Sequence, residues 1–303
     1  MKRPVILNCL VLAALLLGSA LIARAQLPAS AFDYKEPAIQ VRQVSVQNRP
    51  QVRIRDIRFT GISGQPIAAY IVEPRLPCQP RRWGCAGVLF VHWYERGVNN
   101  SNRSEFLPDA LELARHGTVS LLIQTMWSTP GWFKTRTPET DYQASIEQVK
   151  NLRRSLDVLL KQPGIDPMRI AYVGHDFGAL YGGILAGIDQ RVHAYVLLNG
   201  SQCLSDWFLS GRRLNPAQRK QVEDRLKPLC PSAYIARAGA PMLLQFGRSD
   251  PYVPVKSAEA FAADAPLPKT VFFYDSGHSL NEQARMDRLG WLERRLNLKP
   301  RQE

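Results

Sequence analysis

The feature that most constrains the fold is a strand, a glycine-flanked turn and a helix that follow one another directly between residues 169 and 186. Residues 169–173 form an apolar run typical of a buried strand, and residues 180–186 are small and apolar, as in a closely packed helix. Between them lies Gly174-His175-Asp176-Phe177-Gly178. Glycines on both sides of a strained central residue let the helix pass close to the strand. The sequence therefore predicts an elbow that presents Asp176 beside the free N–H groups of a helix start.

Apolar strands alternate with helices along most of the chain, which predicts a mostly parallel sheet covered by helices on both faces. The expected strands of this part are 87–92, 120–124, 169–173, 192–198, 241–246 and 270–274, and the expected helices are 105–116, 140–161, 180–186, 255–264 and 281–296. Three earlier ranges alternate apolar and polar residues, as antiparallel strands with one solvent-exposed face do: 39–46, 52–59 and 67–72. The fold class is α/β, with antiparallel strands leading in at one edge.

The N-terminus has the pattern of a secretion signal. Lys2 and Arg3 precede an apolar run over residues 5–22, and Ala23-Arg24-Ala25 is a small-x-small cleavage site. We expect residues 1–25 to be removed, leaving a secreted or periplasmic chain with no stable membrane insertion. The alternative is an uncleaved anchor, because the run is close to a spanning length. No linker rich in glycine or serine divides residues 26–303, which predicts a single domain with a short helical lid at about 200–238.

Cysteine usage agrees with export. Once Cys9 is removed with the signal, four cysteines remain, and they allow three disulfide connectivities. We favour Cys78–Cys85 and Cys203–Cys230, because each pair is local in sequence and closes a loop. A zinc site is disfavoured, since the chain has neither a C-x-x-C motif nor a histidine at ligand spacing.

Charge patterning does not point to a nucleic-acid partner. The net charge is +13, and it becomes +10 when Lys2, Arg3 and Arg24 leave with residues 1–25. A basic surface can attract nucleic acid, an anionic cell surface or acidic substrates. Here the lysines and arginines are scattered and no nucleic-acid motif accompanies them. The oligomeric state stays open.

Two further residues complete a candidate catalytic constellation. Asp250 follows the 241–246 strand, and His278 follows the 270–274 strand after a glycine that allows a turn. With Asp176 they leave the carboxyl ends of parallel strands in the order nucleophile, acid, histidine, at the edge where open α/β sheets bind ligands. Taken singly, Asp250 is also compatible with a helix N-cap and His278 with a surface turn.

Backbone donors and aromatic residues complete the expected site. The backbone N–H groups of Tyr94 and Phe177 are candidates for an oxyanion hole, because Tyr94 follows the 87–92 strand and Phe177 follows Asp176. Four tryptophans are candidates for the lining of a pocket for a small hydrophobic substrate, with core packing as the alternative for each: Trp93, Trp127, Trp132 and Trp207. His92 is interpreted as a structural loop histidine, and no metal or cofactor is expected.

These motifs resemble the α/β-hydrolase superfamily, and most closely its dienelactone hydrolase-like branch. The resemblance covers about residues 60–297 and is carried by His92-Trp93-Tyr94-Glu95-Arg96-Gly97-Val98-Asn99, Asp166-Pro167-Met168-Arg169-Ile170 before the elbow, Gly247-x-x-Asp250-x-x-Val253-Pro254, and Gly277-His278. It implies an eight-stranded fold, no cofactor, and hydrolysis of esters or lactones by a nucleophile–acid–histidine triad. The elbow itself, Gly-His-Asp-x-Gly, resembles that of epoxide hydrolases and haloalkane dehalogenases.

Asp176 departs from the dienelactone hydrolase pattern, in which the nucleophile is cysteine or serine. A carboxylate attacks a saturated carbon more readily than an ester carbonyl, which predicts an alkyl-enzyme ester that His278-activated water then hydrolyses. Phe177 stands where the aspartate-type families have tryptophan, and residues 200–238 are shorter than their caps. Two alternatives stay open: Asp176 as a general base, and a non-catalytic binding protein on a hydrolase scaffold.

Overall fold

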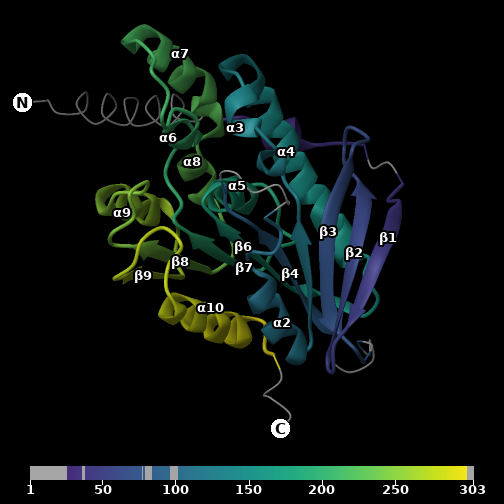
Figure 1. The fold of residues 1–303 in the computed structure, drawn as a ribbon. Helices are drawn as coiled ribbons and strands as arrows, with labels where there is room; N and C mark the ends of the chain where they lie inside the picture. The colour runs from purple at the N-terminus through teal and green to yellow at the C-terminus, as the bar shows by residue number, and fades with distance from the viewer. Residues whose placement is uncertain (1–25, 36–37, 77, 79–83, 96–101, 299–303) are drawn as a thin grey trace, which may run out of the picture.

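All nine strands belong to one sheet in the computed structural model, which describes residues 26–35, 38–76, 78, 84–95 and 102–298 (Figure 1). The strands are β1 (Val41–Asn48), β2 (Val52–Thr60), β3 (Pro66–Pro74), β4 (Cys85–Val91), β5 (Thr118–Ile123), β6 (Ile165–His175), β7 (Ala194–Leu198), β8 (Met242–Gly247) and β9 (Lys269–Tyr274). They lie in the order β1-β2-β3-β5-β4-β6-β7-β8-β9. The predicted signal, residues 1–25, falls outside the described residues.

The sheet combines an antiparallel edge with a parallel body, as the sequence predicts. The pairs β1–β2, β2–β3 and β3–β5 are antiparallel, and every pair from β5–β4 to β8–β9 is parallel. The strand count is nine, in agreement with the nine apolar ranges and one more than the resemblance implies. β1 is exposed along its whole length, so it joins the sheet by pairing with β2 and needs no buried side chain of its own.

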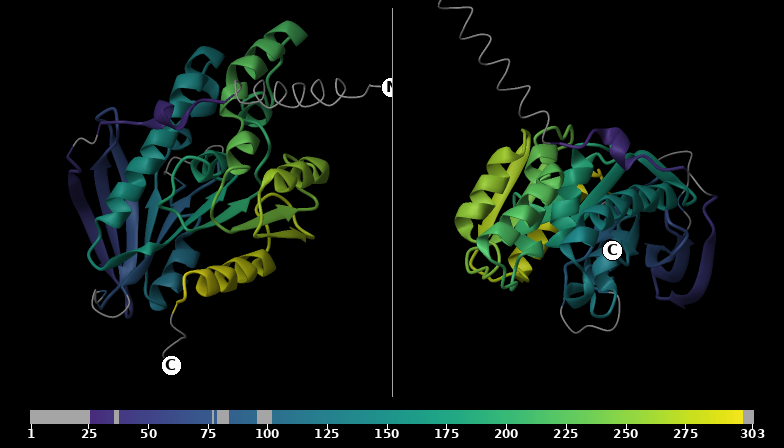
Figure 2. Two further views of the ribbon diagram at one scale, coloured as in Figure 1. Left: turned by 180° about the vertical axis from the view of Figure 1, so that it is seen from behind. Right: turned by 90° about the horizontal axis from the view of Figure 1, so that it is seen from above.

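Helices cover both faces of the sheet (Figures 1 and 2). The helices are α2 (Leu107–Arg115), α3 (Trp132–Thr135), α4 (Pro138–Leu160), α5 (Phe177–Ala186), α6 (Leu204–Phe208), α7 (Pro216–Leu226), α8 (Pro231–Ile235), α9 (Val255–Asp264) and α10 (Glu282–Arg295). Buried residues of α4, α5, α8 and α9 pack in one cluster, and those of α2 and α10 in the other. No helix within the described ranges is long and apolar enough to cross a membrane.

The chain changes direction at β4, and this positions the site. From β4 it passes through α2 to β5 on one side, and α4 then returns it to β6 on the other side of β4. Helix α4 is capped by Thr137, whose side chain accepts the N–H of Thr140 in a capping box. Loops that follow β4 and β6 therefore diverge at a topological switch point, where open α/β sheets place ligands.

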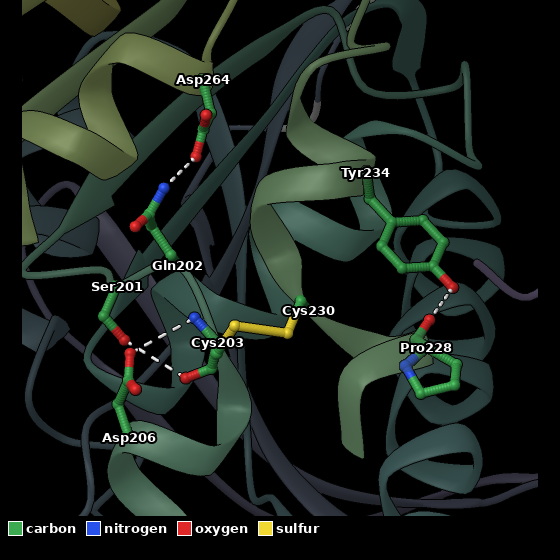
Figure 3. Close-up of a disulfide and its surroundings, with 8 residues drawn as sticks. All are labelled: Ser201, Gln202, Cys203, Asp206, Pro228, Cys230, Tyr234 and Asp264. Carbon is green, nitrogen blue, oxygen red and sulfur yellow. Dashed lines mark hydrogen bonds between the residues drawn. A yellow bond between two sulfur atoms is a disulfide. The ribbon is translucent and has the colours of Figure 1, made fainter. Parts of the chain in front are cut away.

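Residues 200–238 contain α6, α7 and α8 rather than one continuous helix. A disulfide between Cys203 and Cys230 joins the residues that precede α6 and α8 (Figure 3). In the same segment the Tyr234 hydroxyl donates to the carbonyl of Pro228 at 2.8 Å. A second disulfide, Cys78–Cys85, ties the loop before β4 to its first residue. Both pairs are the ones favoured from the sequence.

Candidate active site

The turn between β6 and α5 holds Asp176 in an unusual backbone conformation. Its φ is 56°, which is rare for a residue other than glycine, and its side chain is buried. A Cβ on Gly174 would meet the carbonyl of Gly178, and a Cβ on Gly178 would meet the carbonyl of Val91. The two glycines thus allow the helix to approach both strands while Asp176 occupies the tip.

Asp176, Asp250 and His278 lie together at the carboxyl edge of the sheet. His278 Nδ1 is 2.8 Å from Asp250 Oδ2, and His278 Nε2 is 3.9 Å from Asp176 Oδ2. Asp250 Oδ1 accepts the backbone N–H groups of Tyr252 at 2.8 Å and Val253 at 3.1 Å. Asp250 is therefore fixed by its own loop and orients the imidazole, whose second nitrogen faces Asp176.

The three groups shift one another's pKa values. Burial favours the neutral form of Asp250, but the hydrogen bond and charge of His278 and the two backbone N–H groups outweigh it, so the pKa is lowered. Burial also opposes the charge on His278, yet Asp176 and Asp250 together raise its pKa to about 9. Burial raises the pKa of Asp176, partly offset by His278, by the Tyr94 N–H and by the charge of His175. With both carboxylates ionised, His278 is a cation at neutral pH.

The backbone N–H of Tyr94 points at Asp176 itself. It donates to Asp176 Oδ2 at 3.1 Å, so one carboxylate oxygen occupies the donor that the sequence assigns to an oxyanion hole. Asp176 Oδ1 is buried and has no hydrogen-bond partner among the described residues. Phe177, the other expected donor, begins α5, where the first N–H groups lack an intrahelical acceptor. One oxygen of Asp176 is held, and the other is available.

Hydrogen bonds around His92 support the loop that carries Tyr94. His92 Nε2 lies 3.1 Å from the Thr125 hydroxyl and 2.9 Å from the Ser128 hydroxyl, and Nδ1 lies 2.6 Å from the carbonyl of Trp93. Burial lowers the pKa of His92 to about 4, so its ring is neutral. The Trp127 indole donates to the carbonyls of His92 and Trp93. His92 thus has the structural role expected, and Trp127 is buried behind the loop.

All four candidate tryptophans lie near the elbow: Trp127 stacks on Phe177 with ring centroids 5.4 Å apart, and the other three contact His278 or Phe177. The Trp93 ring is nearly parallel to the His278 ring, with centroids 5.7 Å apart. Trp132 meets Phe177 edge-on, with ring centroids 5.4 Å apart. The centroid of the Trp207 ring lies 5.5 Å from that of His278 and 5.7 Å from that of Phe177. Tyr252, which the sequence interpretation did not select, lies 5.1 Å from His278. The surroundings of Asp176 and His278 are consequently aromatic and apolar.

Comparison with known proteins shows similarity at the level of structure. No protein-family model matches the sequence, and no curated protein matches it. An acetyl xylan esterase from Paenibacillus sp. R4 has 19% identity and a TM-score of 0.72, over 91% of this chain and 93% of that chain. Acetyl xylan esterase 1 from Thermoanaerobacterium sp. JW/SL YS485 has 15% identity and a TM-score of 0.65, over 86% and 91%. The chain has the α/β-hydrolase fold. A predicted dienelactone hydrolase from Klebsiella pneumoniae subsp. pneumoniae MGH 78578 has 15% identity and a TM-score of 0.55, over 86% and 99%.

Within this α/β-hydrolase fold, Asn199 is a site residue that the sequence interpretation missed. It directly follows β7, has a φ of 48° and is fully buried. Its amide nitrogen donates to the carbonyl of His278 at 2.5 Å, and its amide oxygen accepts the N–H of Gly247 at 3.1 Å. Asn199 therefore ties the ends of β7 and β8 to the His278 loop. The sequence signal for Asn199 was an Asn-Gly pair after an apolar strand, since asparagine tolerates left-handed backbone.

Residues Arg96 to Asn99, which contribute to the family resemblance, fall outside the described ranges.

Proposed function

We propose that the chain is an exported hydrolase in which Asp176 attacks a small hydrophobic alkyl electrophile, His278 activates water and Asp250 orients His278. The observation that carries the proposal is the unequal environment of the two Asp176 oxygens. Oδ2 accepts the Tyr94 N–H and faces His278, whereas Oδ1 is buried with no partner in the described part of the chain. The fold supports hydrolysis as the reaction class, because the acetyl xylan esterases that resemble it are hydrolases.

An alkyl electrophile suits this arrangement better than an acyl electrophile. Attack by Oδ1 forms a bond to the substrate carbon as the bond to the leaving group breaks, and the leaving group takes the electron pair. Oδ2 then becomes the carbonyl oxygen of an ester, already held by the Tyr94 N–H. When water adds to Cγ of Asp176, negative charge develops on Oδ2, where that donor stabilises it. With an ester substrate, the donor would have to exchange Oδ2 for the substrate oxygen.

The charge of His278 fits the order of the two steps. In the free enzyme, two carboxylates keep His278 protonated, with a pKa of about 9. Esterification removes the charge of Asp176, so the pKa of His278 falls and its Nε2 becomes a base. It takes a proton from water as the oxygen bonds to Cγ, then returns the proton to the departing alcohol as the bond between Cγ and Oδ1 breaks. The histidine becomes a base only once there is an ester to hydrolyse.

A second candidate is hydrolysis of an ester or lactone with Asp176 as the general base. The observation that favours it is the raised pKa of Asp176, since a base works best with a pKa near the operating pH. Water activated by Asp176 would attack the substrate directly, and His278 would shuttle the proton. No bond to Asp176 would form, and this separates the two schemes.

The test is turnover of epoxides, haloalkanes, lactones and aryl esters by the mature protein and by Asp176→Asn. We expect an alkyl electrophile to be turned over, the variant to be inactive, and His278→Gln to accumulate added mass on the peptide containing Asp176. A single turnover in water enriched in a heavy oxygen isotope should place that isotope in the Asp176 carboxylate. Ester turnover that survives Asp176→Asn, or product labelling without labelling of Asp176, would reject the covalent scheme. Asp189→Asn is the matched control, because Asp189 is a buried, arginine-paired carboxylate before β7, at the opposite sheet edge.

We also infer that the protein works outside the cytoplasm as residues 26–303, with residues 200–238 as a lid on a single domain. The signal pattern of residues 1–25 and the two disulfides support export. The contact of Trp207 with His278 supports the lid, because it brings this segment against the site. Intact mass of the exported protein tests the cleavage, which should leave Gln26 as the first residue.

A further inference from the structure

We propose that Glu105 and His175 form a partly buried ion pair that positions the loops of His278 and Tyr94, so that both are positioning residues of the site. The contacts are independent of the reaction, whereas the kinetic consequence rests on the proposed function. Neither residue belongs to the triad. Glu105 lies just before α2 and His175 ends β6, so the pair connects elements from separate parts of the chain.

Glu105 uses its two carboxylate oxygens for two different loops. Oε1 lies 2.6 Å from His175 Nδ1, and Oε2 accepts the backbone N–H of Trp93 at 2.7 Å. Trp93 is the residue before Tyr94, whose N–H contacts Asp176. A single carboxylate thereby fixes the distance between the end of β6 and the loop after β4.

The other nitrogen of His175 holds the backbone of His278. His175 Nε2 lies 3.0 Å from the His278 carbonyl, which also accepts from Asn199 at 2.5 Å. The Trp93 ring stacks on both His175 and His278, at 5.0 and 5.7 Å between centroids. The His278 loop is thus held through its main chain by the same ring that Glu105 holds.

The two ring nitrogens of His175 face different acceptors. Nδ1 faces a carboxylate and Nε2 faces a carbonyl, both of which only accept, so a ring that donates from both nitrogens satisfies both contacts. The ring is buried, and the charged or titratable groups around it are Glu105, Asp176 and His278. Asn199 Nδ2 lies 3.2 Å from Nε2, which defines the competing state: a neutral ring that accepts there.

The expected consequence is a loss of geometry at His278 when the pair is broken. When the ring is neutral and its Nε2 accepts from Asn199, the His278 carbonyl loses one of two donors, and the imidazole shifts relative to both carboxylates. Displacements of about 1 Å can cost about 100-fold in rate. We expect Glu105→Gln to slow hydrolysis of the ester intermediate by about 10- to 100-fold, with a fall in kcat and little change in KM.

The deciding experiment is nitrogen NMR of the histidine side chains in the full mature protein, with Glu105→Gln, Glu105→Asp and Asp189→Asn. We expect both His175 nitrogens to carry protons at neutral pH in the wild type and in Asp189→Asn. In Glu105→Gln the ring should become neutral, and the pKa of His278 should move from about 9 toward its ordinary value of 6.5. Glu105→Asp, which keeps the charge, should restore part of both signals.

Two results would overturn the proposal: a neutral His175 in the wild type, or an unchanged His278 titration in a folded Glu105→Gln. If Glu105→Gln does not fold, Glu105→Asp decides, because its shorter carboxylate must still shift the His278 titration in part. None of these signals needs a substrate. An inactive protein with the expected NMR signals would reject the proposed function and keep the positioning pair.

Discussion

The loops after β4 and β9 both place a histidine beside the elbow, yet the two histidines have opposite charge states. His92 faces the hydroxyls of Thr125 and Ser128, and burial lowers its pKa to about 4. His278 faces Asp176 and Asp250, which outweigh burial and raise its pKa to about 9. Burial alone therefore neutralises a histidine here. Its partners decide whether the ring is neutral or charged.

The largest expected effect comes from removing the carboxylate at the elbow. Asp176→Asn should reduce turnover of any alkyl substrate by about 10,000-fold or more, because the amide has no nucleophilic oxygen of comparable strength. It should also lower the pKa of His278, since one of the two carboxylates that hold the proton is gone. Kinetics and an NMR titration measure the two effects. An unchanged pKa of His278 would mean that its 3.9 Å contact with Asp176 contributes little to the difference between His278 and His92.

Asp250→Asn should reduce turnover by about 1,000- to 10,000-fold, because the amide no longer favours the productive orientation of His278. The pKa of His278 should fall in this variant too, because Asp250, at 2.8 Å from Nδ1, also favours the protonated ring. His92 should keep its titration in both variants. A parallel shift of His92 would show that the change had spread beyond the His278 loop.

The two histidines should give stability opposite slopes with pH. The folded pKa of His92 is below its ordinary value of 6.5, so its contribution is complete above pH 6.5 and is lost as the pH falls toward 4. The folded pKa of His278 is above that value, so its contribution is complete below pH 6.5 and is lost as the pH rises through about 9. Each contribution is on the order of 3 kcal/mol.

Denaturant unfolding of His92→Gln and His278→Gln across this pH range measures those slopes. We expect His92→Gln to flatten the acid side of the stability profile and His278→Gln to flatten the alkaline side. If one substitution flattened both sides, the charge states of the two loops would be coupled, and the contrast between them would fail.

The smallest effect is expected at the partners of His92. Ser128→Ala removes one hydroxyl, while Thr125 still contacts the same nitrogen. We expect a loss of about 1 kcal/mol in the free energy of unfolding and little change in turnover, measured by denaturant titration. A loss of turnover well beyond the loss of stability would give the His92 loop a direct part in catalysis.

Much of the fold follows from local patterns, because most strands and helices bury apolar residues of their own, while β1 is the exposed exception. The range 255–264 matches α9, and the three triad residues follow their strands as expected. β6 begins at Ile165, four residues earlier than predicted, since Asp166 and Pro167 break the apolar run while the backbone still pairs with β4. The pairing of Ile165 depends on the neighbouring strand β4, which the local sequence pattern of β6 does not specify.

The parts of the site that could not be predicted depend on long-range contacts. Glu105 reaches His175 across 70 positions, and Asn199 reaches His278 across 79. Glu105 carries no pattern that distinguishes it from a solvent-exposed residue. The Asn-Gly pair at Asn199 indicates a turn, but it does not indicate the contact with His278. The Tyr94 N–H was expected beside the nucleophile, but which atom it holds depends on the rotamer of Asp176. Such details require the packed structure.

The close approach of Gly178 to Val91 has a consequence for how the protein can change during evolution. Val91 directly precedes His92, so the backbone of the elbow and the start of the Tyr94 loop touch with no side chain between them. Neither can be displaced without the other. New substrate ranges should therefore arise from substitutions of Trp132 and Trp207, which contact the site through their side chains, while laboratory selections leave Gly174 and Gly178 unchanged.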